Sequence, residues 1–211
     1  MTRNLYLVGY RGTGKSTVGR LVAEALNRPF VDLDERIELE AGRSIAEIFA
    51  DEGEGGFRDR EAAALVEVDC GGKFPNLPPN NLIDTPSAGS DFAMIGRQVG
   101  KLAATADGSV IATGGGIVLR AENRRLLQST GFVVWLQASP EILWQRIRAD
   151  THTAARRPDL TSGGPGEIVE LLAVRERFYR EVADAVVDAG GASPEAVADA
   201  ILTAIRFFPS D

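Results

Sequence analysis

Gly9-Tyr10-Arg11-Gly12-Thr13-Gly14-Lys15-Ser16-Thr17 decides the fold of this chain, because it fits the phosphate-binding pattern G-x-x-x-x-G-K-[ST]. Its glycines allow successive backbone N–H groups to approach an anion, and the positive end of the following helix points at the same anion. We expect Lys15 to reach the β- and γ-phosphates of a nucleotide and the Ser16 hydroxyl to ligate Mg²⁺. The nucleotide-binding residues that the pattern predicts are Gly12, Thr13, Gly14, Lys15, Ser16 and Thr17.

The segments on either side of this loop support the prediction. Residues 4–8 include a short apolar run typical of a strand, and apolar residues recur with helical spacing from Val18 to Leu26. The alternative interpretation is an ordinary glycine-rich turn between a strand and a helix. Because phosphate binding requires the order strand, loop, helix, we favour the phosphate-binding loop.

The composition is typical of one globular domain spanning residues 1–211, with 44% hydrophobic and 25% charged residues. A net charge of −7 argues against nonspecific binding to nucleic acid or to an acidic membrane surface. We expect neither a membrane span nor a signal peptide, because no apolar run approaches ~20 residues and the first strand begins almost at once. The single cysteine, Cys70, suits a cytoplasmic location, and with the single histidine, His152, it cannot form a usual zinc site.

Short strands alternate with helices along the rest of the chain. Strands are expected at residues 29–32, 110–113, 132–136 and 185–188, and helices at residues 35–41, 57–66, 119–129, 140–148, 167–183 and 194–205. Another short helix follows Ser44, a predicted N-cap that forms a capping box with Glu47. The alternation predicts a three-layer α/β/α fold with a five-stranded parallel sheet and ligand-binding loops at the carboxyl ends of the strands.

Two carboxylates follow the second predicted strand, in Asp32-Leu33-Asp34. If the backbone is still extended there, both side chains lie on one side and face the ligand crevice. One carboxylate could then serve the metal and the other a substrate hydroxyl. The alternative is an acidic strand end or a helix N-cap, which is common at such positions.

Three further features could bind anions. Arg58 or Arg60 could hold a carboxylate in a planar, two-pronged manner, although a helix surface of Arg/Glu pairs is the usual alternative. Gly114-Gly115-Gly116 follows a buried strand and exposes backbone N–H groups, although it could also be a simple turn. Residues 150–166 are rich in Arg, Thr, Gly and Pro, and form either a mobile lid over the nucleotide or an exposed basic loop.

In their order along the chain, these pieces resemble the shikimate kinase family. The resemblance implies ATP-dependent phosphorylation of the 3-hydroxyl of shikimate, in aromatic amino-acid biosynthesis, by a cytoplasmic monomer whose partners are ATP and shikimate. It also implies a helical substrate-binding region at residues 35–68 and a lid at residues 150–166. The matching residues are 9–17, Asp32-Leu33-Asp34, Ser44-Ile45-Ala46-Glu47-Ile48-Phe49, Gly53-Glu54, Phe57-Arg58, Glu61, Gly114-Gly115-Gly116, Arg157-Pro158, Leu160, Arg175 and Tyr179.

On the nucleotide side, the resemblance assigns each role to a position in this sequence. Lys15 would contact the transferred phosphoryl group, Ser16 would bind Mg²⁺, and Asp32 would support the metal through water. Arg157 would be the lid arginine that reaches ATP. The resemblance also implies that Arg146 or Arg148 lies against adenine.

On the acceptor side, the resemblance gives roles to four residues. Asp34 would hold the substrate hydroxyls and orient or deprotonate the attacking one. Arg58 and Arg175 would bind the shikimate carboxylate, and Gly115 would offer it a backbone N–H. The catalytic residues implied are therefore Lys15, Asp34 and Arg157.

Some features depart from the family's usual pattern. Residues 69–108 form an insertion rich in glycine, proline and asparagine, and an ordered segment and a mobile loop fit this composition equally well. The lid has extra residues, and Asp159 interrupts its usual Arg-Pro-Leu-Leu style of sequence. Two alternative functions stay open: a kinase for another small hydroxy acid, such as gluconate, and a nucleotide-binding module without transfer activity.

Overall fold

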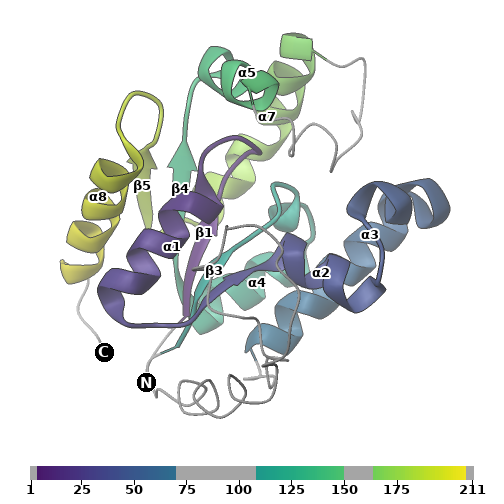
Figure 1. The fold of residues 1–211 in the computed structure, drawn as a ribbon, viewed down its shortest axis with the longest axis horizontal. Coiled ribbons are helices and arrows are strands. Elements are labelled where there is room, and N and C mark those ends of the chain that lie inside the picture. Colours follow the sequence, from purple (N-terminus) through teal and green to yellow (C-terminus); the bar gives the residue numbers. More distant parts are fainter. Residues whose placement is uncertain (1–3, 70–107, 150–163, 208–211) are drawn as a thin grey trace, which may run out of the picture.

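The computed structural model describes residues 4–69, 108–149 and 164–207, which Figure 1 shows as a ribbon. Five strands form one parallel sheet in the order β2-β3-β1-β4-β5. This sheet confirms the predicted five-stranded parallel architecture. Its strands are β1 (Asn4–Val8), β2 (Phe30–Asp32), β3 (Val110–Ala112), β4 (Gly131–Gln137) and β5 (Ala185–Asp188).

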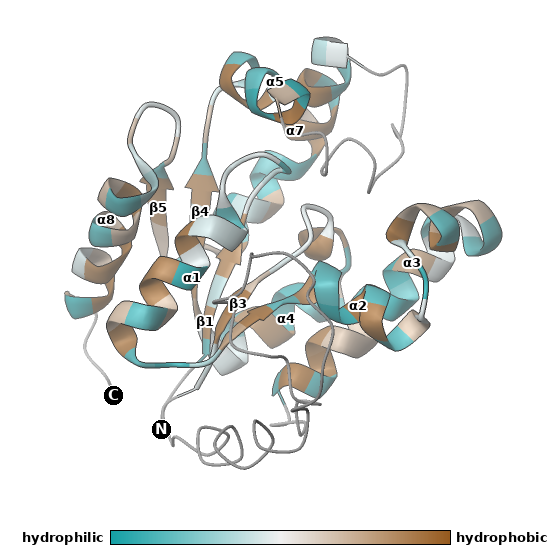
Figure 2. Cartoon of the chain, viewed as in Figure 1, coloured by the Kyte–Doolittle hydropathy of each residue, from teal (hydrophilic) through white to brown (hydrophobic). Residues whose placement is uncertain are grey.

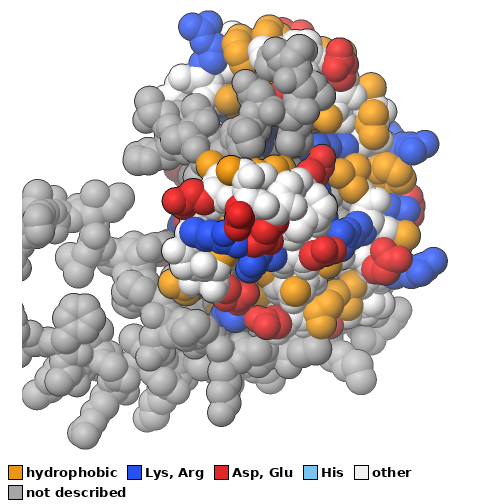
Figure 3. Space-filling model, turned by 90° about the vertical axis from the view of Figure 1, so that its right-hand side faces the viewer, with side chains coloured by type: hydrophobic (Ala, Val, Ile, Leu, Met, Phe, Trp, Pro, Cys, Tyr) orange, Lys and Arg blue, Asp and Glu red, His pale blue; other side chains and the backbone are white. Residues whose placement is uncertain are grey.

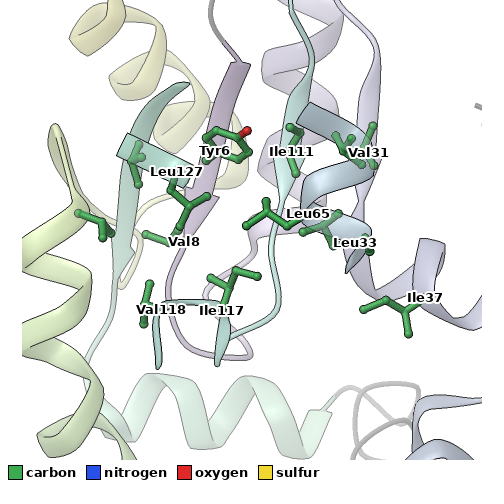
Figure 4. Packing of buried hydrophobic residues seen from close by; sticks show 14 of the residues in the cluster. Tyr6, Val8, Val31, Leu33, Ile37, Leu65, Ile111, Ile117, Val118 and Leu127 are labelled. Carbon is green, nitrogen blue, oxygen red and sulfur yellow. The ribbon is translucent and has the colours of Figure 1, made fainter. Parts of the chain in front are cut away.

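Helices cover both faces of the sheet, which gives the three predicted layers (Figure 1). Leu5 and Leu7 of β1 pack in the core shared with α1 (Lys15–Leu26) and α8 (Pro194–Arg206). Tyr6 and Val8 point to the opposite core, which includes α4 (Ala121–Thr130) and α7 (Gly164–Val182). This alternation follows from the two-residue period of a strand, and Figure 4 shows Tyr6 and Val8 in that second core. The strands are correspondingly brown, or apolar, in Figure 2.

A helical region lies beside the sheet and consists of α2 (Leu33–Ala41) and α3 (Ile45–Asp69). α3 is interrupted at Gly53, where φ is 70° and ψ is −175°, so it contains both helices expected between residues 45 and 66. The predicted capping box is present, because the Glu47 carboxylate accepts from the Ser44 N–H at 2.7 Å and Ser44 Oγ accepts from the Glu47 N–H at 3.3 Å. Arginine and acidic side chains lie close together on this face of the molecule (Figure 3).

Several boundaries differ from the sequence-based expectations. α2 begins at Leu33 rather than at residue 35, because Asp32 caps it by accepting hydrogen bonds from the N–H groups of Asp34 and Glu35. α7 begins at Gly164, three residues before its expected start at residue 167. The remaining elements are the 3-10 helix η3 (Ile117–Leu119) and α5 (Pro140–Ala149).

The expected insertion at residues 69–108 lies almost entirely outside the described residues, as do residues 150–163 of the expected lid. In the three described segments, no helix combines the length and the apolar composition that crossing a bilayer would require.

Candidate active site

Three glycines of the phosphate-binding loop adopt backbone conformations that other residues rarely adopt. The φ angle is 141° at Gly9, 83° at Gly12 and 87° at Gly14. A Cβ atom at Gly9 would also lie only 2.4 Å from the carbonyl oxygen of Leu136 in β4. Glycine is therefore required at position 9 by both conformation and space, and the loop is held close to the carboxyl end of the sheet.

The ammonium group of Lys15 lies inside the phosphate-binding loop. Lys15 Nζ donates to the carbonyl oxygens of Gly9 and Tyr10, both at 2.8 Å. Thr13 is buried beside it and donates to the carbonyl oxygen of Tyr10 at 2.9 Å, whereas Thr17 is exposed on the first turn of α1. Because α1 begins at Lys15, the positive end of the helix dipole and the Lys15 ammonium group both place positive charge at the phosphate-binding loop.

Ser16 and Asp32 meet at the carboxyl edge of the sheet. Ser16 Oγ donates to Asp32 Oδ2 at 2.5 Å, while Asp32 Oδ1 accepts from the N–H of Asp34 at 3.0 Å. The chain turns into α2 directly after Asp32, so the premise that an extended backbone places Asp32 and Asp34 on one side is wrong. The N-cap alternative describes Asp32, and Asp34 lies half-buried in the first turn of α2.

The chemistry of the Ser16–Asp32 pair fits a hard divalent cation. Burial raises the pKa of the Asp32 carboxyl, and the neighbouring Asp34 carboxylate raises it further. The hydrogen bond from Ser16 lowers this pKa, but the net shift is upward. A nearby cation would favour the ionised form, and oxygen atoms are the ligands that Mg²⁺ prefers. Within the described segments, no group of three or more His, Cys, Asp and Glu residues could hold a metal alone. Phosphate oxygens and water are ligands that could complete the metal's coordination.

Arg58 is buried in α3, and its guanidinium group lies against residues 114–116, which we call the glycine turn. Its Nη1 donates to Glu61 Oε2 at 2.8 Å and its Nη2 to Glu54 Oε1 at 3.0 Å. A Cβ atom at Gly116 would lie 2.2 Å from Arg58 Nη1, so the guanidinium fills the space that this glycine leaves. Arg60, the other arginine considered for this role, pairs instead with Glu52 at 2.8 Å.

Arg175 approaches the same glycine turn from α7. Its Nη1 donates to the carbonyl oxygen of Gly115 at 3.5 Å, and the Tyr179 hydroxyl donates to the same oxygen. The guanidinium carbon of Arg175 also lies 5.7 Å from the centre of the Tyr10 ring, within cation–π range. The fold therefore brings Arg58 and Arg175 together at two successive glycines.

The glycine turn also lies against the phosphate-binding loop. A Cβ atom at Gly115 would be 3.4 Å from both the backbone nitrogen of Arg11 and the carbonyl oxygen of Gly9. The glycine turn therefore lies between the phosphate-binding loop and the two arginines. Because glycines have no side chains, the loop and the arginines lie close together at one edge of the sheet.

Comparison with known proteins identifies the family to which this arrangement belongs. A family model described as shikimate kinase matches residues 11–69 and 89–206 of the chain. The chain belongs to the shikimate kinase family. A shikimate kinase from Rhodopirellula baltica is 39% identical over 203 residues, which cover 96% of this chain and 90% of the relative. One from Symbiobacterium thermophilum is 43% identical over 181 residues, which cover 85% of this chain and 83% of the relative.

A solved structure of the same family has a closely similar fold. The shikimate kinase from Acinetobacter baumannii in complex with shikimate superposes with a TM-score of 0.75 at 33% identity, covering 98% of this chain and 94% of that one. The resemblance inferred from the sequence is confirmed. The chain is accordingly an ATP-dependent phosphotransferase with a hydroxyl group as acceptor.

Two buried acids, Glu61 and Glu167, pair with arginines in this member of the shikimate kinase family, and no role was predicted for them from the sequence. Glu61 is 0% exposed and pairs with Arg58, and the three-residue spacing of the two on one helix is a signal that could have been used. Glu167 is 1% exposed and pairs with Arg11 at 3.3 Å. No local pattern connects Arg11 to Glu167, because they lie far apart in the sequence.

Two of the arginines expected near the nucleotide, Arg146 and Arg148, lie within the described residues. Arg146 donates to the carbonyl oxygens of Gly12 at 3.4 Å and Ala189 at 2.8 Å, so it lies beside the phosphate-binding loop. Arg148 lies over the ring of Trp144 at 5.8 Å. Arg157 lies outside the described residues.

Proposed function

We propose that this member of the shikimate kinase family transfers the γ-phosphoryl group of ATP to the 3-hydroxyl of shikimate, giving shikimate 3-phosphate and ADP. The observation that carries the proposal is the position of the glycine turn, which touches the phosphate-binding loop and also Arg58 and Arg175. Phosphoryl transfer depends mainly on positioning and on neutralising charge. A carboxylate bound by the two arginines would hold the acceptor beside the nucleotide.

On the acceptor side, Arg58 and Arg175 bind the carboxylate of shikimate, and Gly115 contributes a backbone N–H. Guanidinium groups suit this task because they bind carboxylates in a planar, two-pronged geometry. Both arginines are buried, so solvent screens their charge only weakly. Glu61 holds Arg58 and the Gly115 carbonyl holds Arg175, which reduces the ordering that substrate binding must provide.

During the transfer, Asp34 orients the attacking 3-hydroxyl and accepts its proton. The hydroxyl oxygen forms a bond to the γ-phosphorus, and the bond from that phosphorus to the bridging oxygen of ADP breaks. Lys15 stabilises the charge on the transferred group from within the loop. We assign the lid arginine that reaches ATP to Arg157, in the proposed lid at residues 150–166.

The nucleotide is bound by residues 12–17, and Mg²⁺ is the proposed metal. Ser16 would hold the metal directly, and Asp32 would support it through water. When bound, Mg²⁺ neutralises charge on the β- and γ-phosphate oxygens. The oxygen-only donor set and the short Ser16–Asp32 contact support this assignment.

Replacement of Asp32 by asparagine should distinguish the contribution of Asp32 to metal binding from its contribution to folding stability. Asparagine is as good an N-cap as aspartate, and its neutral side chain removes the repulsion from Asp34. We expect the free energy of unfolding of the metal-free protein to rise by less than about 1 kcal/mol. We expect kcat with Mg²⁺ to fall about 10- to 100-fold. Denaturant unfolding and Mg²⁺ titration of the rate measure the two effects, and a less stable, fully active variant would contradict both.

Replacement of Gly116 by alanine should displace Arg58. Its Cβ atom would overlap the guanidinium group, which can move only by leaving its position at the turn. We expect the KM for shikimate to rise about tenfold, as for loss of one charge-assisted hydrogen bond, with little change in the KM for ATP. Steady-state kinetics measure this. Gly55→Ala is the matched control, because a Cβ there meets nothing within 4 Å, and an unchanged shikimate KM in Gly116→Ala would argue against the role of Arg58.

We also propose that the enzyme is a cytoplasmic monomer with one domain, in which residues 35–68 bind substrate and residues 69–108 are an insertion. A single cysteine suits a reducing compartment. Sedimentation velocity of the active enzyme at assay concentration tests the monomer, and a larger active species would contradict it.

The proposed reaction is tested by ADP release from purified protein with ATP and Mg²⁺, with shikimate, with gluconate or with no acceptor. We expect turnover that depends on shikimate. If turnover occurs only with gluconate, the acceptor is gluconate and not shikimate. If the protein binds ATP but neither compound stimulates ADP release, the proposed activity is contradicted.

A further inference from the structure

Arg11 and Glu167 form an ion pair that has no role in the reaction described above. Arg11 Nη2 lies 3.3 Å from Glu167 Oε1, and the two side chains are 15% and 1% exposed. Arg11 belongs to the phosphate-binding loop, and Glu167 lies in the first turn of α7. Burying such a pair costs desolvation, so its presence is weak evidence for a contribution to stability alone.

The helix that carries Glu167 also carries Arg175, which lies about two turns further along. Between them, Ile168 packs in one buried cluster with Tyr10 of the phosphate-binding loop. Arg175 then lies over the Tyr10 ring and donates to Gly115. α7 therefore contacts the nucleotide side through its first turn and reaches the acceptor side through Arg175.

We propose that the Arg11–Glu167 pair couples nucleotide binding to shikimate binding. The pair ties the phosphate-binding loop to the start of α7, so a nucleotide that stabilises this loop conformation also stabilises Arg175 in its position at the glycine turn. Arg11 and Glu167 act as positioning residues in this role. The inference rests on the proposed function of Arg175 as a ligand of the shikimate carboxylate.

This coupling has a measurable thermodynamic consequence. If nucleotide raises the affinity for shikimate by some factor, shikimate must raise the affinity for nucleotide by the same factor. Glu167→Gln keeps the size of the side chain and one acceptor oxygen but removes the charge that attracts Arg11. It should therefore reduce the factor while leaving the contacts of Arg175 in place.

Calorimetric titration of shikimate into the full chain, with and without ADP and Mg²⁺, measures the factor. We expect ADP and Mg²⁺ to raise the shikimate affinity of the wild type by at least about fivefold. In Glu167→Gln we expect this factor to fall to about one. The affinity of this variant for shikimate without nucleotide should change by less than about twofold. Glu176→Gln is the matched control, because Glu176 lies on the same helix and pairs with Arg180 at 3.0 Å on the exposed surface. It should keep the wild-type factor.

Three outcomes would overturn the inference. The first is a wild-type factor of one, and the second is an unchanged factor in Glu167→Gln. The third is an equal loss of shikimate affinity in Glu167→Gln with and without ADP, which would indicate that the pair has only a structural role. Thermal unfolding checks that Glu167→Gln is folded, and Arg11→Gln provides the same test from the other partner if it is not. Arg175→Ala separates the two proposals, because unchanged shikimate binding in that variant would refute the acceptor site itself.

Discussion

Replacement of Lys15 by alanine is expected to lower kcat for shikimate-dependent ADP release by about 10³-fold. The ammonium group is buried in the phosphate-binding loop, where the carbonyl oxygens of Gly9 and Tyr10 fix it at 2.8 Å. A fixed charge at this place stabilises the transferred phosphoryl group most strongly in the transition state. The loss should therefore appear in kcat more than in the KM for ATP. Steady-state kinetics with saturating shikimate measure it.

Two controls accompany the Lys15 experiment. Lys15→Arg keeps a positive charge but not the compact ammonium group, so we expect it to restore activity only partly. Thermal unfolding of both variants shows whether α1, which begins at this residue, is intact. A folded Lys15→Ala enzyme with kcat within about tenfold of the wild type would remove Lys15 from the proposed mechanism.

Replacement of Asp34 by asparagine should have the second largest effect, a fall in kcat of about 10²- to 10⁴-fold. Asparagine has a similar size and can accept a hydrogen bond, but it cannot take the proton from the attacking hydroxyl. The KM for ATP should change little, since the loop residues that bind ATP are untouched. ADP release at saturating ATP and shikimate measures kcat.

Glu35→Gln provides the matched control for Asp34. Glu35 is the next residue of α2 and pairs with Arg20 at 3.0 Å, with both side chains 36% exposed. We expect this control to keep nearly full activity. Near-normal kinetics for Asp34→Asn itself would contradict the assignment of Asp34 to the acceptor site.

Local patterns in the sequence were sufficient to predict the phosphate-binding loop, the capping box at Ser44 and the parallel sheet. Each of these depends on residues that are close in sequence, such as the glycines of the loop or the alternation of strands and helices. The start of α2 was less predictable, because Asp32-Leu33-Asp34 fits an extended strand end and a helix N-cap equally well. Only the tertiary contact from Ser16 and the turn into α2 distinguish the two.

The acceptor site depended on contacts that no local pattern encodes. Arg58 and Arg175 both lie on helices with other charged residues, and the usual expectation for such residues is a solvated surface. The structure buries them because glycines at positions 115 and 116 leave space for their guanidinium groups or provide a carbonyl acceptor. Their roles came from family resemblance, and their convergence became visible only in the fold.

A crystal structure of the enzyme with ADP, Mg²⁺ and shikimate bound tests most directly whether the phosphate-binding loop and the acceptor site serve one reaction. We predict that the shikimate carboxylate contacts the guanidinium groups of Arg58 and Arg175, and that its 3-hydroxyl lies between Asp34 and the β-phosphate of ADP. A carboxylate bound away from both arginines, or a 3-hydroxyl turned away from the nucleotide, would contradict the proposed site.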